Sequence, residues 1–249
     1  MPSDPPPDDD PLSVDDIPLD PGVGGPPGDR EASADRPSIR PPENVAVVGI
    51  VGGVASGKST LAKWLERTQG WPRIDADLIG HSVLTRDDVR DALRRRFGDA
   101  IFRPDGSVER PALAHLVFGV AEDRLKNRRD LEAIVHPVIA DVIVAEVHAA
   151  ARFEPTPGGI IVDAPVLLEA GLGPLCDRVI FLDTKESVRK GRAVRGRGWS
   201  EDEWRSREQS QWPLAKKRDY ADVVVEAGLS VDETGKRAVE LLTAPQAAG

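Results

Sequence analysis

The chain has 249 residues, of which 40% are hydrophobic and 30% charged, so it can form one α/β domain of ordinary size with a buried core. Its net charge of −9 is concentrated in residues 1–43, which hold eleven acidic residues and three arginines, and the nearly neutral remainder argues against nucleic acid as a partner. We expect no membrane span and no secretory signal, and the single cysteine excludes an intramolecular disulfide and favours a cytoplasmic location. No pattern indicates an oligomeric state.

The first 43 residues predict a disordered, acidic, Pro-rich tail. They contain twelve of the 22 prolines and few large apolar residues. Such a segment buries too little surface to offset the entropy of ordering it. We interpret it as a linker, with a docking role as the alternative, and we expect the folded domain to occupy residues 44–249.

An apolar run over residues 45–51 predicts a strand buried on both faces. A glycine-rich turn, a helix over residues 59–69 and a short extended piece at residues 73–74 follow. The pattern then becomes helical over residues 87–151, where Pro137 is expected to begin a new helix or to bend the old one.

The last third of the chain alternates strands with helices. Strands are predicted at residues 160–163, 178–183 and 223–225. Two capping boxes mark helix starts, Ser200 with Glu203 and Ser230 with Glu233. This alternation indicates an α/β fold with a five-stranded parallel sheet flanked by helices.

The most informative motif lies between the first strand and the first helix. It matches G-x-x-x-x-G-K-[ST] and reads Gly52-Gly53-Val54-Ala55-Ser56-Gly57-Lys58-Ser59. Its glycines leave room for backbone amides to approach a polyphosphate, Lys58 supplies a positive charge, and the Ser59 hydroxyl is suited to Mg²⁺. We therefore predict an ATP site, with Mg²⁺ as cofactor, formed by Gly52, Gly53, Val54, Ala55, Ser56, Gly57, Lys58, Ser59 and Thr60.

A P-loop alone does not distinguish kinases from GTPases. The nearest match to a guanine-reading N-K-x-D motif is Asn127-Arg128-Arg129-Asp130, which has arginine in place of lysine and lies in a charged helical stretch. Asp232 and Gly235 fit D-x-x-G, but they lie in a helix near the end of the chain. The sequence therefore favours a kinase.

Three aspartates are candidates for the chemistry of a kinase. Asp75 and Asp77 follow the second strand, and Asp163 ends the third. The carboxyl ends of parallel strands line the ligand crevice, so these carboxylates can serve the acceptor or Mg²⁺. The alternatives are helix caps for Asp75 and Asp77 and a turn-forming role for Asp163.

Cations are abundant from Lys185 to Arg218. A mobile, arginine-bearing lid would exclude water and stabilise charge on the transferring phosphoryl group. We expect a lid over residues 185–215, with one to three of its cations touching phosphate and the others on a solvated helix face. Arg192 and Arg195 are the candidates for catalysis.

Taken together, these motifs resemble the dephospho-CoA kinase family from about Ala46 to Leu242. The P-loop is followed in order by Ile74-Asp75-Ala76-Asp77, Asp105-Gly106-Ser107 with Leu113 and Phe118, His136-Pro137, Asp163-Ala164-Pro165-Val166-Leu167-Leu168-Glu169, Gly198-Trp199-Ser200 through Arg207 and Gln211, and Lys217 with Ala221-Asp222. Val166 and Leu168 depart mildly from the family pattern.

The resemblance implies ATP-dependent phosphorylation of the 3′-hydroxyl of dephospho-CoA, which gives CoA. It implies a helical acceptor-binding insertion over residues 85–150 and assigns Asp77 as the base or hydroxyl-orienting residue. Asp75, His136 and Pro165 are the further acceptor-binding candidates, with a helix cap as the alternative for His136. Ser59 and Asp163 are the metal candidates.

One departure concerns the adenine end of the site. The family usually has an Asn-x-Gly-like or Asn-Gly-like turn after the last strand, close to the adenine, whereas this chain reads Glu226-Ala227-Gly228. Two other functions stay open at this stage. One is a small-molecule P-loop kinase with a nucleoside, nucleotide or shikimate-like acceptor, and the other is an inactive nucleotide-binding regulator.

Overall fold

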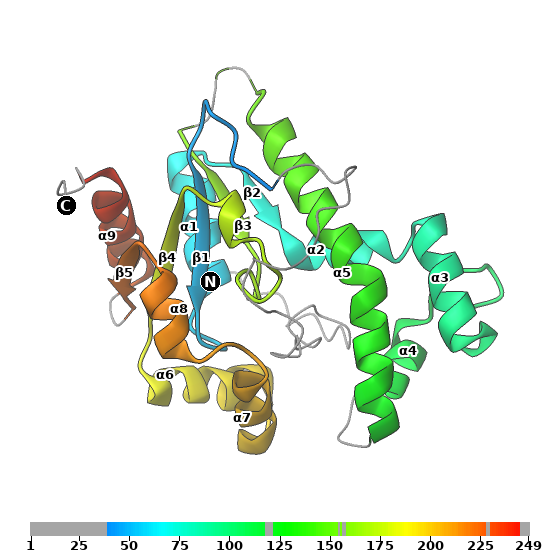
Figure 1. Cartoon of the computed structure of the whole chain (residues 1–249). Helices are drawn as coiled ribbons and strands as arrows, with labels where there is room; N and C mark the ends of the chain where they lie inside the picture. The colour runs from blue at the N-terminus through cyan, green and yellow to red at the C-terminus, as the bar shows by residue number, and fades with distance from the viewer. Residues whose placement is uncertain (1–38, 118–121, 154, 156–157, 228–229, 245–249) are drawn as a thin grey trace, which may run out of the picture.

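The structure is a computed structural model that describes residues 39–117, 122–153, 155, 158–227 and 230–244. Most of the predicted tail therefore lies outside the described residues, as do Phe118 and Gly228. The remaining elements form a sheet with helices around it and a second group of helices beside it (Figure 1).

Five parallel strands form a single sheet in the order β2-β3-β1-β4-β5. The strands are β1 (Val47–Gly52), β2 (Arg73–Asp75), β3 (Ile160–Asp163), β4 (Arg178–Asp183) and β5 (Val223–Glu226). The five-stranded parallel sheet predicted from the sequence is confirmed. Because every strand is parallel, all five carboxyl ends lie along one edge, where ligands bind in open α/β sheets.

The side chains of β1 are buried on both faces of the sheet, which explains why apolar and polar residues do not alternate along this strand. Val48 and Ile50 pack on helices α1 (Lys58–Gln69) and α9 (Val231–Thr243). Val47 and Val51 belong to the larger core on the opposite face. Helix α8 (Leu214–Tyr220) contacts β1 and β4.

The predicted helical region beside the sheet contains several helices. Helix α5 packs against three of them, and the set is α2 (Ala76–Val83), α3 (Asp87–Phe97), the short helix η2 (Asp99–Ile101), α4 (Arg110–Val117) and α5 (Glu122–Ala150). Figure 1 shows this group on the side of the sheet where β2 lies.

Pro137 lies inside α5, so the first alternative, a new helix that begins there, is wrong, and a bend in α5 stays the prediction. Packing of α5 against its neighbours outweighs the hydrogen bond that proline removes.

By length and composition alone α5 could cross a membrane. Its buried residues, among them Leu131, Val135 and Ile143, instead belong to the same core as the sheet.

The region after β4 contains α6 (Glu186–Gly191), the π-helical segment η4 (Arg192–Gly196) and α7 (Glu201–Gln209). Figure 1 shows α6 and α7 beyond the end toward which β1 runs, as a lid requires. Both predicted capping boxes mark helix starts. Ser200 caps α7 through the Glu203 amide, and Ser230 with Glu233 forms a complete box at α9.

Candidate active site

The P-loop has the backbone geometry of an anion cradle. Gly57 precedes α1 with φ of 104°, a conformation that a side chain would strain. Ala55 also has a positive φ, 60°, which is uncommon for a residue with a Cβ atom and typical of functional sites. The Lys58 Nζ atom donates to the Gly53 carbonyl at 3.2 Å, so the cation lies over the loop that it serves.

Two residues outside the loop hold its middle in place. The Ser56 carbonyl accepts hydrogen bonds from Thr184 Oγ1 at 2.9 Å and from Arg192 Nη1 at 2.7 Å. Thr184 follows β4 directly, and Arg192 begins η4. The structure thus places the predicted Arg192 against the P-loop through a backbone contact.

Carboxylates gather where β2 and β3 end, beside the start of α1. Asp163 is buried, and its Oδ1 atom accepts from the Ser59 hydroxyl at 3.2 Å. Its Oδ2 atom lies 2.8 Å from Arg73 Nη1, and the same nitrogen lies 2.6 Å from Asp75 Oδ2. Burial raises the pKa of Asp163, and Arg73 opposes that rise.

This contact between Ser59 and Asp163 suits the predicted magnesium site. The hydroxyl stands at the phosphate end of the P-loop with a carboxylate behind it, a donor set of the hard oxygens that Mg²⁺ prefers. The described residues contain no cluster of three or more His, Cys, Asp or Glu side chains suited to a metal.

Asp75 and Asp77 have different local roles. The Asp75 carboxylate caps α2 by accepting from the amides of Asp77 at 3.0 Å and Leu78 at 3.2 Å. The cap alternative is therefore correct for Asp75 and wrong for Asp77. Asp77 lies half-buried in the first turn of α2, two residues after Asp75.

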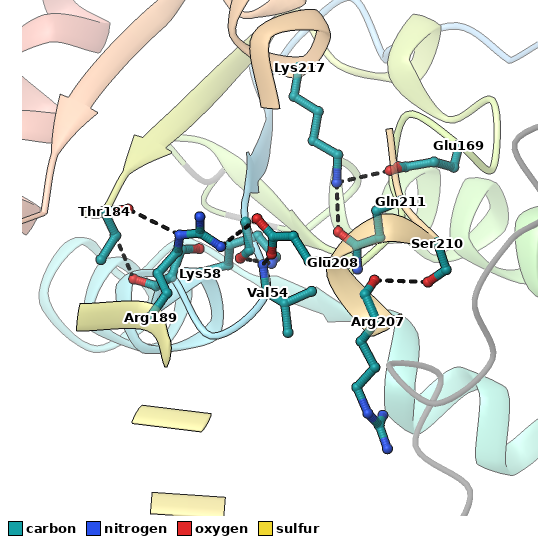
Figure 2. A network of polar contacts seen from close by, with 12 residues as sticks. Val54, Lys58, Glu169, Thr184, Arg189, Arg207, Glu208, Ser210, Gln211 and Lys217 are labelled. Carbon is teal, nitrogen blue, oxygen red and sulfur yellow. Dashed lines mark hydrogen bonds and ion pairs between the residues drawn. The ribbon is translucent and has the colours of Figure 1, made fainter. Parts of the chain in front are cut away.

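In the segment predicted as a lid, an ion pair joins α6 to α7, and a hydrogen bond joins α7 to the P-loop (Figure 2). Sequence reasoning missed Glu208, which makes both contacts. Glu208 of α7 accepts from the Val54 amide at 2.8 Å through Oε2 and pairs with Arg189 at 2.5 Å through Oε1. Arg189 also donates to the Thr184 carbonyl at 3.1 Å. Trp204 joins Val54 in a small apolar cluster, so the lid has both polar and apolar contacts with the loop.

Three further predicted site residues are Arg195, Pro165 and His136. The Arg195 side chain is exposed and lies beside Gly191 at the end of α6. Pro165 is buried in the turn after β3. His136 lies inside the continuous helix α5, so the helix-cap alternative is wrong, and burial lowers its imidazole pKa to about 4.

The matches to GTPase motifs have structural explanations. Asn127 and Asp130 lie on α5 and accept hydrogen bonds from Arg96 of α3 at 2.7 and 2.6 Å. Asp232 accepts from the Trp64 indole at 2.6 Å at the start of α9. Both segments thus take part in contacts between helices.

A phosphate cradle, a lid bearing arginines, and carboxylates at the ends of β2 and β3 together define a P-loop phosphotransferase. The family model for dephospho-CoA kinase matches residues 46–233. A dephospho-CoA kinase from Geobacillus kaustophilus is 34% identical over 196 residues, covering 78% of this chain and 94% of the relative. One from Rhodopirellula baltica is 35% identical over 201 residues, covering 80% and 90%.

Solved structures agree on the fold. TT1252 from Thermus thermophilus has a TM-score of 0.65 and 29% identity, covering 82% of this chain and all of that one. Dephospho-CoA kinase from Campylobacter jejuni has a TM-score of 0.58 at 22% identity, covering 79% and 94%. The chain belongs to the dephospho-CoA kinase family.

Proposed function

We propose that this protein transfers the γ-phosphate of ATP to the 3′-hydroxyl of dephospho-CoA, the last step of coenzyme A synthesis. The observation that carries the proposal is a complete P-loop facing the carboxylates at the ends of β2 and β3, in a chain of this family. An inactive regulator would not need Lys58, Ser59, Asp77 and Asp163 together at this edge of the sheet.

Each part of the site has a proposed task. The P-loop amides and Lys58 bind the phosphates, and lid arginines, with Arg192 and Arg195 as candidates, stabilise charge on the transferring group. Mg²⁺, when bound at Ser59 and near Asp163, neutralises the charge of the β- and γ-phosphates. Asp77 orients the acceptor hydroxyl and takes its proton late in the transfer.

The acceptor pocket is proposed along α2 and α5. Asp75, Asp77, His136 and Pro165 are its candidate residues. The pKa of His136 is lowered to about 4 by burial, so this imidazole is neutral at pH 7 and serves as a hydrogen-bonding group rather than as a cation. We also propose a cytoplasmic location, consistent with the single cysteine.

The acceptor is tested by coupling ADP release to an optical signal with dephospho-CoA, AMP, adenosine and shikimate in parallel. Dephospho-CoA should have a kcat/KM at least about a hundredfold higher than the others, because the pantetheine arm supplies remote binding energy that orients the hydroxyl. A higher kcat/KM for AMP, adenosine or shikimate would replace this proposal with a different small-molecule kinase.

A further inference from the structure

Arg73 connects the two sides of the candidate active site. It lies on β2 two residues before Asp75, so the two side chains point to the same face of the sheet. Asp75 is the Cα partner of Asp163 on β3, which brings the second carboxylate beside the first. The Arg73 Nη1 atom lies between them, at 2.6 Å from Asp75 and 2.8 Å from Asp163.

Each of these carboxylates has a second contact, and the two contacts face different substrates. The other oxygen of Asp163 accepts from Ser59, on the phosphate side of the site. The other oxygen of Asp75 caps α2, the helix that carries Asp77, on the acceptor side. A single guanidinium nitrogen therefore links the phosphate side to the acceptor side.

The charges explain why a cation is required at this position. The side chains of Asp163 and Asp75 are only 5% and 18% exposed, so two adjacent carboxylates would repel each other with little screening by water. The Arg73 guanidinium, which stays protonated in proteins, supplies the positive charge between them, and its side chain is 11% exposed.

We propose that Arg73 is a positioning residue for phosphoryl transfer. Its guanidinium is the cation that holds Asp75 and Asp163 together, and it thereby sets the spacing between Ser59 and the helix that carries Asp77. This inference rests on the proposed function, because it assigns these two groups to phosphate and acceptor. A displacement of about 1 Å between reacting groups can cost on the order of a hundredfold in rate.

The test compares two substitutions at Arg73 with a matched arginine elsewhere. Arg73→Met removes the charge, and Arg73→Lys keeps a cation that can reach both carboxylates, since both contact the same nitrogen. Arg237→Met is the control, because Arg237 lies on α9, outside the proposed acceptor-binding insertion and lid, and its Nη1 atom pairs with Glu240 at 2.7 Å.

Steady-state kinetics provide the first readout. We expect Arg73→Met to lower kcat for dephospho-CoA phosphorylation at least about thirtyfold. The KM for ATP should stay within about threefold, because the P-loop is unchanged. Arg73→Lys should recover most of the kcat, and Arg237→Met should leave it unchanged. Wild-type kcat in Arg73→Met, or an equal loss in Arg237→Met, would overturn the proposal.

Binding of Mn²⁺ without nucleotide, measured by electron paramagnetic resonance, provides the second readout. Removing the guanidinium leaves two carboxylates that recruit a hard cation, so Arg73→Met should bind Mn²⁺ at least about tenfold more tightly than wild type. Adding Asp163→Asn to Arg73→Met should abolish the gain. Because this readout needs no acceptor, it remains valid if dephospho-CoA proves to be the wrong substrate. Absence of the gain would overturn the proposal.

Discussion

Lys217 is the basis of a stability prediction that can be worked out from its contacts. Its side chain is 1% exposed, and its ammonium lies 2.9 Å from Glu169 and 2.7 Å from Gln211 (Figure 2). Glu169 also accepts from the Trp212 amide at 2.8 Å. This network connects α8 to the turn after β3 and to the chain that leaves the lid helix α7.

Lys217→Met keeps the apolar stem but removes the charge, so Glu169, 3% exposed, loses its counterion. Removing one partner of a buried ion pair lowers the free energy of unfolding by about 3–5 kcal/mol. For a domain of this size each kcal/mol lowers Tm by about 2–4 °C, so we expect a Tm lower by roughly 6–20 °C. Urea unfolding followed by far-UV circular dichroism, with a thermal scan alongside, measures both quantities.

Lys236→Met is the matched control for this change. Its ammonium lies 3.9 Å from Asp232 and its side chain is 72% exposed, so its loss should cost less than about 0.5 kcal/mol. A loss of less than about 1 kcal/mol in Lys217→Met, or equal losses in both variants, would refute the reasoning from burial.

Three further predictions concern activity. Lys58→Ala should keep the circular dichroism spectrum and lower turnover by orders of magnitude, and near-normal turnover would refute its role. Asp77→Asn should lower kcat roughly a hundredfold and change the ATP affinity measured by calorimetry little, whereas Asp75→Asn should lower kcat less. If Asp77→Asn keeps more than about a third of the wild-type kcat, Asp77 is not the base. Glu208→Ala should lower kcat/KM for ATP about tenfold, because the Val54 amide and Arg189 lose their hydrogen-bond acceptor. An unchanged kcat/KM would show that the lid docks on the P-loop without Glu208.

Prediction from sequence worked best where the determining residues are neighbours in the chain. The P-loop, its following helix and the box formed by Ser230 and Glu233 are each set within a few residues. Pro137 shows the opposite case. Its local preference allowed a helix start or a bend, and contacts of α5 with distant helices excluded the start by keeping the helix continuous.

The sequence by itself determined the class of fold and the position of the phosphate cradle, because strand periodicity, glycine geometry and helix capping are local properties. Only the tertiary structure decided how the site is held together. Val54 and Glu208 are 154 positions apart, and Arg73 and Asp163 are 90 apart. Residues at such separations share no sequence periodicity. The parallel pairing of β2 with β3 brings Arg73 to Asp163, and the docking of α7 brings Glu208 to the Val54 amide.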